Sequence, residues 1–175
     1  MIIKLTLYKT HALAPADAGW LMQKGYGEKT EGGVILMPEE AAYLISRGKA
    51  VPLTPTGRKI DPKRIDRVYA NLDAWHARKH AYAHLRDQGF IVKSGAKYGV
   101  HYRIYAKGEK PGQAHSTWLA HVVNENERIS MRTLAAWIRL AHSVRKTFWL
   151  IMHTEGDIVI YSMDWEKTFR KKTEV

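Results

Sequence analysis

The segment YGVHYRIYAKGEKPGQAHSTW, residues 98–118, holds two strand signals separated by a loop signal. The pattern of YGVHYRIY predicts a strand, with one side formed by His101, Arg103 and Tyr105 and the other by Tyr98, Val100, Tyr102 and Ile104. The Gly, Pro and Lys residues of AKGEKPGQA predict a loop, and His115 follows it at the start of the next strand. Tyr105 and His115 therefore flank one loop. They are candidates for a shared site, or else a packed aromatic and a surface histidine.

Outward from this segment, the C-terminal half alternates strand and helix signals. Apolar and β-branched runs predict strands at FIVKSG, STWLAHVV, TFWLIMH and DIVIYSM. A helix is expected from about residue 131 to 145, with Ser130 as its cap and an apolar stripe formed by Leu134, Ile138 and Ala141. Residues 89–175 are therefore expected to form a compact α/β unit.

The N-terminal part has its own pattern, which predicts a small mixed α/β domain over residues 1–60. IIKLTLY and GGVILM are strand signals, and MPEEAAYLISRGK carries the start and stop signals of a helix. The glycine-rich insert QKGYGEKTEGG, residues 23–33, is expected to be an exposed loop. PLTPTGRKIDP, residues 52–62, indicates a linker, and one long helix over residues 63–88 would connect the domains, whose boundaries we place at 60 and 88.

Composition restricts the chemistry and suggests a partner. The 175 residues include 28 Lys and Arg against 17 Asp and Glu, a formal charge of +11, and no cysteine. Disulfides, thiolate nucleophiles and cysteine-ligated metals are excluded. The positive charge, with six Trp and nine Tyr, favours nucleic acid as the partner. No apolar run approaches the roughly 20 residues of a membrane span, so we expect a cytoplasmic protein with no membrane contact.

Two further patterns have alternative interpretations. His76, His80 and His84 are four residues apart and would share a helix face, yet no glutamate lies between the first two, so a basic surface stripe is favoured over a metal site. Arg132, Arg139 and Lys146 recur every seven residues and, with His142, are expected on roughly one face of the C-terminal helix. Such a face is either simply solvated or suited to phosphate contacts.

Three motifs, KYGVHYRIYAKG, HSTWLAHVV and IRLAHSVRKTFWLIM, resemble the archaeal tRNA-splicing endonuclease family in order and spacing. The resemblance implies a restriction-endonuclease-like C-terminal nuclease domain with a central mixed sheet. It also implies a metal-independent endoribonuclease without cofactors, which excises introns from precursor tRNA at bulge-helix-bulge junctions and leaves 2′,3′-cyclic phosphate and 5′-hydroxyl ends. The alternative is a structural subunit of the same complex that binds RNA without cutting it.

The catalytic triad of the family corresponds to Tyr105, His115 and Lys146 in this sequence. By resemblance, Tyr105 is the base at the 2′-oxygen, His115 the acid at the leaving 5′-oxygen, and Lys146 the cation that stabilises the phosphorane. A tyrosine of ordinary pKa, about 10, is a poor base at neutral pH. We expect the cations Lys146 and Arg103 to lower that pKa by favouring the phenolate. A metal-dependent DNA nuclease is disfavoured, since this unit has no Asp and Glu cluster near the triad.

The resemblance also assigns contacts to RNA and to other subunits. The expected RNA-binding residues are Arg139, which corresponds to an arginine that stacks on a bulge base, together with Arg103, His142 and Lys29. Glu155 and Asp157 are the expected inter-subunit contact, inserted into a basic pocket of a partner, and DIVIYSMDW resembles a pairing edge between subunits. A heterotetramer with a structural subunit is favoured over a homotetramer, because the insert resembles a loop that touches RNA through Lys24 or Lys29.

Overall fold

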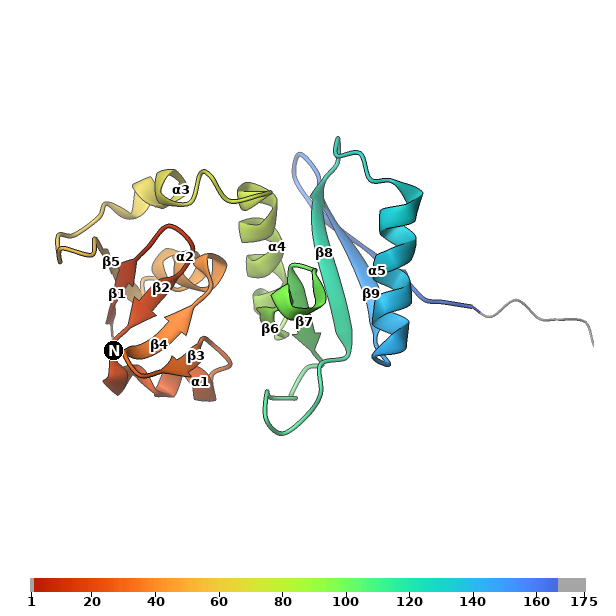
Figure 1. The fold of residues 1–175 in the computed structure, drawn as a ribbon. Helices are drawn as coiled ribbons and strands as arrows, with labels where there is room; N and C mark the ends of the chain where they lie inside the picture. The colour runs from red at the N-terminus through yellow and green to blue at the C-terminus, as the bar shows by residue number, and fades with distance from the viewer. Residues whose placement is uncertain (1, 167–175) are drawn as a thin grey trace, which may run out of the picture.

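Two five-stranded sheets, each with its own helices, make up residues 2–166, the part of the chain that the computed structural model describes (Figure 1). The first sheet has the strand order β3-β4-β2-β1-β5 and the second has the order β10-β9-β8-β7-β6. Both sheets are mixed, since β1 pairs in parallel with β5 and β8 with β9, while the other pairs are antiparallel. The expected mixed α/β class with two units is confirmed.

The N-terminal unit surrounds an apolar core that includes Leu5, Leu21, Leu36 and Leu44. Its elements are β1 (Ile3–Leu7), β2 (Ala12–Ala14), the 3-10 turn η1 (Ala16–Ala18), α1 (Trp20–Gln23), β3 (Glu28–Thr30), β4 (Gly33–Leu36), α2 (Pro38–Ser46) and β5 (Ala50–Leu53). Helix α2 begins at Pro38 as the sequence predicts, because the carboxylate of Glu40 accepts a 2.9 Å hydrogen bond from the Met37 N–H.

The glycine-rich insert, residues 23–33, differs from the expected exposed loop. Tyr26 and Gly27 are buried, and β3 pairs with β4 in a hairpin. Gly27 has a φ of +60°, and its N–H donates to Glu40 Oε1 at 2.9 Å while its carbonyl accepts from Lys93 Nζ at 2.6 Å. A side chain at position 27 would collide with Val34, so glycine is required here. The insert therefore joins the two units instead of extending freely into solvent.

The expected linker, residues 52–62, partly belongs to the first sheet. Pro52 lies in β5 opposite Leu5 of β1, and β5 is an edge strand, where a proline is tolerated. The chain then turns back, with the Thr54 N–H donating to the Arg58 carbonyl at 2.8 Å. The proline- and glycine-rich run thus contains the end of an edge strand and a turn, and only its last residues connect the two units.

The connecting segment is not one long helix. It consists of η2 (Pro62–Arg64), α3 (Ile65–Val68) and α4 (Trp75–Asp87). The break occurs where Ala74 adopts a left-handed φ of 47°, directly before Trp75. This conformation lets the Trp75 ring pack 4.9 Å from the Tyr69 ring, and its Nε1 donates to Asp66 at 2.9 Å. Periodicity alone could not reveal that tertiary packing of Trp75 interrupts the helix.

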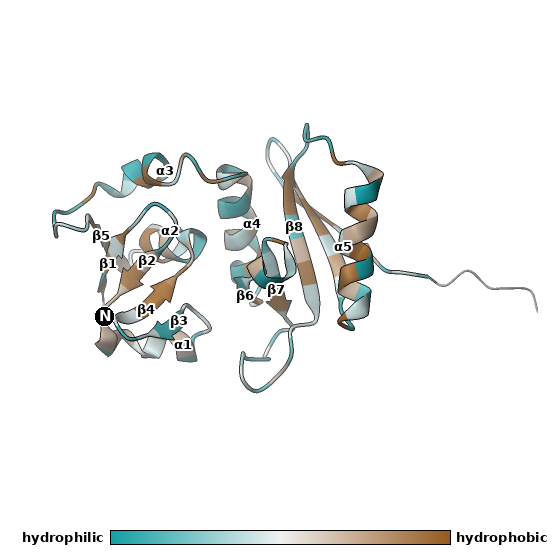
Figure 2. Cartoon of the chain, viewed as in Figure 1, coloured by the Kyte–Doolittle hydropathy of each residue, from teal (hydrophilic) through white to brown (hydrophobic). Residues whose placement is uncertain are grey.

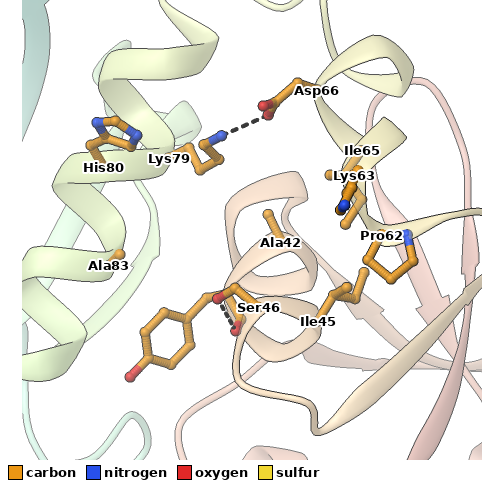
Figure 3. Close-up of a pocket in the computed structure, with 11 residues that line it drawn as sticks. Ala42, Ile45, Ser46, Pro62, Lys63, Ile65, Asp66, Lys79, His80 and Ala83 are labelled. Carbon is orange, nitrogen blue, oxygen red and sulfur yellow. Dashed lines mark hydrogen bonds and ion pairs between the residues drawn. The ribbon is translucent and has the colours of Figure 1, made fainter.

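A small hollow of about 300 Å³ lies where this segment meets α2 (Figure 3). Lys79 of α4 donates to Asp66 at 2.7 Å across its rim. Apolar side chains such as Ala42 and Ile45 form much of the wall. The ion pair and the Trp75 hydrogen bond both end on Asp66, so this carboxylate holds the two helical pieces on either side of the break.

The C-terminal unit is built around the second sheet. Its elements are β6 (Ile91–Ser94), η3 (Ala96–Tyr98), β7 (Tyr102–Tyr105), β8 (Trp118–Asn124), α5 (Met131–Ser143), β9 (Thr147–His153) and β10 (Ile158–Met163). Helix α5 connects the parallel strands β8 and β9, and Ser130 caps it by accepting from the Thr133 N–H at 3.0 Å. Apolar residues concentrate along β8, whereas α5 carries alternating apolar and polar bands (Figure 2).

The strand expected over residues 98–105 is shorter than its pattern. Tyr98 is the last residue of η3, Gly99 follows it with a φ of +66°, and only Tyr102–Tyr105 pair in the sheet. The expected alternation holds for the first three residues of β7, because Tyr102 and Ile104 are fully buried while Arg103 is partly exposed on the other face. Tyr105, expected on the side of Arg103, is buried as well. A left-handed glycine therefore sets the start of this strand.

A buried ion pair joins the two units. Glu39 of α2 is fully buried, and its Oε1 accepts from Arg78 Nε of α4 at 2.6 Å and from the Tyr102 hydroxyl of β7 at 3.0 Å. Burial, followed by the charge of Glu39, raises the pKa of Tyr102 well above its ordinary value, which keeps the hydroxyl a donor. Three elements from both units thus share one carboxylate.

Within residues 2–166, no helix has the length and apolar character needed to cross a membrane.

A column of stacked rings packs the residue before β7, strand β8 and helix α5 together. The His101 ring lies 3.9 Å from the His121 ring, which lies 4.0 Å from Trp137 of α5. The Val122 N–H donates to His101 Nδ1 at 3.0 Å, which requires that nitrogen to be unprotonated. Burial, followed by the charge of His121, lowers the pKa of His101 to about 3, and burial lowers the pKa of His121 to about 4. Both imidazoles are neutral in the folded chain near neutral pH.

Acid should therefore destabilise the fold. Below the unfolded pKa of about 6.5, the unfolded chain binds protons that the folded chain does not, so stability falls as the pH drops from 6.5 toward 4. Each histidine contributes up to about 1.4 kcal/mol per pH unit in this range. We expect the melting temperature of His121→Phe to fall less between pH 7 and 5 than that of wild type. His76→Gln, at an exposed position, is the control; an unchanged slope in His121→Phe contradicts the assignment.

Candidate active site

The three expected catalytic residues lie where β7 ends and β8 and β9 begin, at one end of the central strands of the second sheet. We call this place the edge of the sheet that carries the candidate site. Tyr105 is the last residue of β7, and Lys146 immediately precedes β9. In the register of the sheet, Ile104 pairs with Trp118 of β8, which pairs with Thr147 of β9. Position 117 is therefore opposite both Tyr105 and Lys146, and His115 precedes it by two residues. The edge thus collects residues that are up to 41 positions apart, from 105 to 146.

The position of Lys146 is fixed by the way α5 ends. The Lys146 N–H donates to the Ala141 carbonyl at 2.8 Å and the Arg145 N–H to the His142 carbonyl at 3.0 Å, the pattern of a Schellman motif. Arg145 takes the left-handed position with a φ of 56°, where glycine is usual. Lys146 Nζ then donates to the Ser116 carbonyl. These backbone hydrogen bonds, one from the Lys146 N–H and one from its ammonium, hold the ammonium beside the segment that carries His115.

An open hollow of about 760 Å³ occupies this edge. Its lining residues come from the start of β8, the end of α5, the start of β9 and the segment after β10: His115, Ser116, Thr117, His142, Ser143, Arg145, Lys146, Thr147 and Asp164. The structure therefore brings together His115, His142 and Lys146. With one lysine, one arginine and two histidines against one aspartate, the hollow has the charge expected for a phosphate site.

Tyr105 lies beside this hollow but does not line it. Its side chain is only 4% exposed, and in the sheet it pairs with Ile91 of β6. His115, by contrast, is exposed, two residues before the position opposite Tyr105. Tyr105 thus ends β7 with its side chain packed, whereas His115 lies in the loop just before the neighbouring strand β8 and is open to a ligand.

The exposed face of α5 holds Arg139 and His142 beside the segment that follows β10. The Arg139 guanidinium lies 5.1 Å from the centroid of the Trp165 ring, and His142 Nδ1 lies 3.8 Å from an Asp164 oxygen. Sequence reasoning missed Asp164 and Trp165, because DIVIYSMDW was interpreted as a single strand. The seven-residue spacing also wrongly placed Lys146 on the helix face, because α5 ends at Ser143, before Lys146. Arg132 is exposed on the first turn of α5.

Comparison with known proteins identifies the family of this chain. The model of the tRNA intron endonuclease catalytic C-terminal domain matches residues 76–161, and that of the N-terminal domain matches residues 6–65. The chain belongs to the tRNA intron endonuclease family. It is 36% identical over 151 residues to the tRNA-splicing endonuclease of Thermococcus kodakarensis, covering 85% of this chain and 88% of that protein.

Two further relatives carry the same name. The tRNA-splicing endonuclease of Pyrococcus furiosus is 36% identical over 148 residues, covering 83% of this chain and 84% of the relative. That of Methanothermobacter thermautotrophicus is 34% identical over 141 residues, covering 80% of this chain and 82% of the relative. The similarity extends over both units of the tRNA intron endonuclease fold.

Of the four RNA contacts expected for this tRNA intron endonuclease chain, His142 lines the hollow and Arg139 lies on the same helix, whereas the other two lie elsewhere. Arg103 is half-buried, and its guanidinium pairs at 3.0 Å with Glu28 of β3, which directs its charge toward the N-terminal unit. Lys29, next to Glu28, is exposed on the edge strand β3. The structure does not bring either side chain to the residues that line the hollow.

The expected inter-subunit residues of the tRNA intron endonuclease chain lie at the opposite end of the sheet. Glu155 and Asp157 are exposed in the turn between β9 and β10, where the Thr154 N–H donates to the Asp157 carbonyl at 3.0 Å. In Figure 1 this turn is at the top, away from the lower end where α5 ends and β9 begins. The turn is solvent-exposed, as a contact to another subunit requires.

The histidines of α4 approach this turn rather than the hollow. His80 Nδ1 lies 2.8 Å from His153 Nε2 at the end of β9, and His84 Nε2 lies 2.8 Å from the Gln88 amide. In the described part of the chain, no three His, Asp or Glu side chains are grouped so that they could hold a metal ion. Of the three histidines, His80 contacts the end of β9, and His84 contacts Gln88 at the end of its own helix.

Proposed function

We propose that this chain is a catalytic subunit of a metal-independent endoribonuclease that excises introns from precursor tRNA at bulge-helix-bulge junctions. The observation that carries the proposal is the common sheet edge of Tyr105, His115 and Lys146 in a chain of the tRNA intron endonuclease family. A substrate that supplies its own nucleophile, the 2′-hydroxyl, needs only one proton removed and another delivered.

The proposed reaction is a single displacement at phosphorus. Tyr105, as phenolate, takes the proton of the 2′-hydroxyl, and the 2′-oxygen forms a bond to phosphorus. The bond from phosphorus to the 5′-oxygen breaks, and His115, as imidazolium, gives that oxygen a proton. The products are a 2′,3′-cyclic phosphate and a 5′-hydroxyl. Because Tyr105 is buried, the loop over residues 106–117 must move when RNA binds, so that the tyrosine hydroxyl can reach the 2′-hydroxyl.

Lys146 is suited to stabilise the charge that develops on the phosphorane. Its Nζ is already anchored on the Ser116 carbonyl, beside the segment that carries His115. A cation held in place before the reaction needs no reorganisation when negative charge builds up on the phosphate oxygens. Arg145 and His142 line the same hollow and add donors for the neighbouring phosphate.

Arg139 and Trp165 form an exposed surface on which an RNA base could stack. The guanidinium and the indole ring are 5.1 Å apart on the exposed face of α5, and both side chains are exposed. Bulged bases leave the RNA helix and can be stacked on aromatic rings or guanidinium planes. A bulge base at this place would have its phosphate close to the hollow, since His142 lies on the same helix face, three residues after Arg139.

A cleavage assay in EDTA tests this function. The chain, alone and with a structural subunit, is incubated with an intron-containing precursor tRNA, and we expect cuts at both junctions with cyclic phosphate ends. A 2′-deoxy substitution at each cleavage site should leave binding intact and prevent cutting, because the nucleophile is missing. Strict dependence on a divalent ion, or cutting of the 2′-deoxy substrate, contradicts the mechanism. Binding without cutting under every condition supports the structural-subunit alternative.

The assembly that we propose is a tetramer in which Glu155 and Asp157 contact a neighbouring subunit. Two catalytic and two structural subunits remain the favoured composition and four identical subunits the alternative. The insert, on which this preference was based, has buried contacts to Glu40 and Lys93, so its role is at least partly structural. The mass on a sizing column, with and without a structural subunit, distinguishes the two compositions.

A further inference from the structure

A second basic hollow, of about 440 Å³, opens where the N-terminal unit meets the end of α4. Its lining residues are Trp20, Lys24, Tyr26, Lys49 and Arg86, so each is either a cation or an aromatic. Lys24 and Lys49 are exposed, and Arg86 is partly buried. Among residues 2–166, none of these three cations forms an ion pair with a carboxylate. The hollow therefore carries positive charge available to an anion.

Arg86 is held rigidly in this hollow. Its guanidinium lies 4.1 Å from the centroid of the Tyr26 ring and donates to the Lys24 carbonyl at 2.9 Å and to the Phe90 carbonyl at 3.3 Å. Carbonyl and aromatic contacts orient the guanidinium without neutralising it. An arginine fixed in this way loses little further entropy when it binds a phosphate oxygen.

The basic hollow is connected to the catalytic edge of the sheet. Phe90, whose carbonyl accepts from Arg86, precedes Ile91, which pairs with Tyr105 across β6 and β7. Lys107, two residues after Tyr105, places its ammonium 5.1 Å from the centroid of the Phe90 ring. Figure 1 agrees, because α1, the loop after β7 and the C-terminal end of α5 all lie at the lower end of the molecule. Cations thus continue from Lys146 and His115 through Lys107 to Arg86 and Lys24.

We propose that this hollow binds backbone phosphates of the substrate RNA outside the cleavage junction, in the helix that flanks the bulges. The proposal rests on the proposed function for its ligand. Continuity with the catalytic edge favours RNA over an acidic segment of another subunit, because a duplex leaving the catalytic hollow along this edge would pass Lys107 before reaching Arg86. The N-terminal unit would thereby position the precursor as well as support the nuclease unit.

The test compares Lys24→Gln/Lys49→Gln with wild type on two RNAs. One is a full precursor tRNA and the other a short hairpin that contains only the bulge-helix-bulge and a few flanking base pairs. We expect the double variant to bind the full precursor about tenfold more weakly in physiological salt and to lower the slope of log K against log salt by about one to two units. Binding of the short hairpin and the cleavage rate at saturating precursor should not change.

The matched control is Lys59→Gln/Lys63→Gln, which removes the same charge from exposed positions in the segment between β5 and α3. In Figure 1 this segment runs along the upper left of the molecule, whereas α1 lies at the bottom. Equal losses in control and test variants, or an unchanged slope with the full precursor, overturn the proposal. A smaller assembly mass in Lys24→Gln/Lys49→Gln also overturns it, since the hollow would then receive carboxylates of another subunit. Binding does not require cleavage, so a wild-type chain that fails to cut in EDTA refutes the proposed function while this comparison still tests the hollow.

Discussion

Replacing His115 with alanine is expected to slow single-turnover cleavage by about 10²–10⁴, the usual contribution of a positioned acid or base. RNA affinity should stay nearly unchanged, because His115 is an exposed residue among several cations that line the same hollow. The physical reason is that the leaving 5′-oxygen would depart as an unprotonated alkoxide. Rapid quench with a 5′-labelled precursor measures the rate.

A substrate with sulfur in place of the leaving 5′-oxygen makes this test specific. A thiolate leaves without protonation, so cleavage of the sulfur substrate should be nearly as fast in His115→Ala as in wild type. His142→Ala is the matched control, since His142 lines the same hollow and should affect RNA binding more than the rate. Undiminished activity of His115→Ala on the normal substrate, or no recovery with sulfur, excludes His115 as the acid.

Replacing Arg78 with methionine is expected to destabilise the folded chain by about 3–5 kcal/mol, because it leaves the carboxylate of Glu39 buried without its cation. Glu39 is fully buried, and its second oxygen, Oε2, already has no hydrogen-bond partner within the described residues. Guanidinium denaturation at fixed protein concentration measures the loss.

Two controls separate charge burial from loss of arginine packing. Arg47→Met breaks the pair of Arg47 and Asp87, whose side chains are each 46% exposed, and should change stability by at most about 1 kcal/mol. Combining Arg78→Met with Glu39→Gln should recover part of the lost stability, since no charge is then left buried. If Arg78→Met loses no more stability than Arg47→Met, the ion pair of Arg78 and Glu39 does not hold the two units together.

Local sequence patterns predicted the elements whose stability is local. Helix α5 has its serine cap and apolar stripe where expected, and β9 and β10 follow their apolar runs. The common edge of Tyr105, His115 and Lys146 followed from the family resemblance, because no local pattern places residues 105 and 146 together. The register of β7, β8 and β9 supplies that proximity.

The errors arose where tertiary contacts override local preference. Residues 69–74 interrupt the expected long helix, because Trp75 packs on Tyr69 and binds Asp66. Gly27 is buried in a segment rich in glycine and charge, because two buried polar side chains, Glu40 and Lys93, bind its backbone. Lys146 is not part of the helix, because the chain turns away from the helical path at Arg145, which has a left-handed φ. None of these contacts has a signature in the neighbouring sequence.

Strand β9 acts as a spacer of fixed length inside the molecule. It runs without interruption for seven residues, from Thr147, next to Lys146 at the proposed catalytic edge, to the acidic turn at the other end. At roughly 3.3 Å per residue, it separates those two places by about 23 Å. An extended strand paired on both sides neither stretches nor bends easily. In the proposed tetramer, where the acidic turn anchors a neighbouring subunit, the length of this strand would set the distance between each proposed catalytic centre and that anchor.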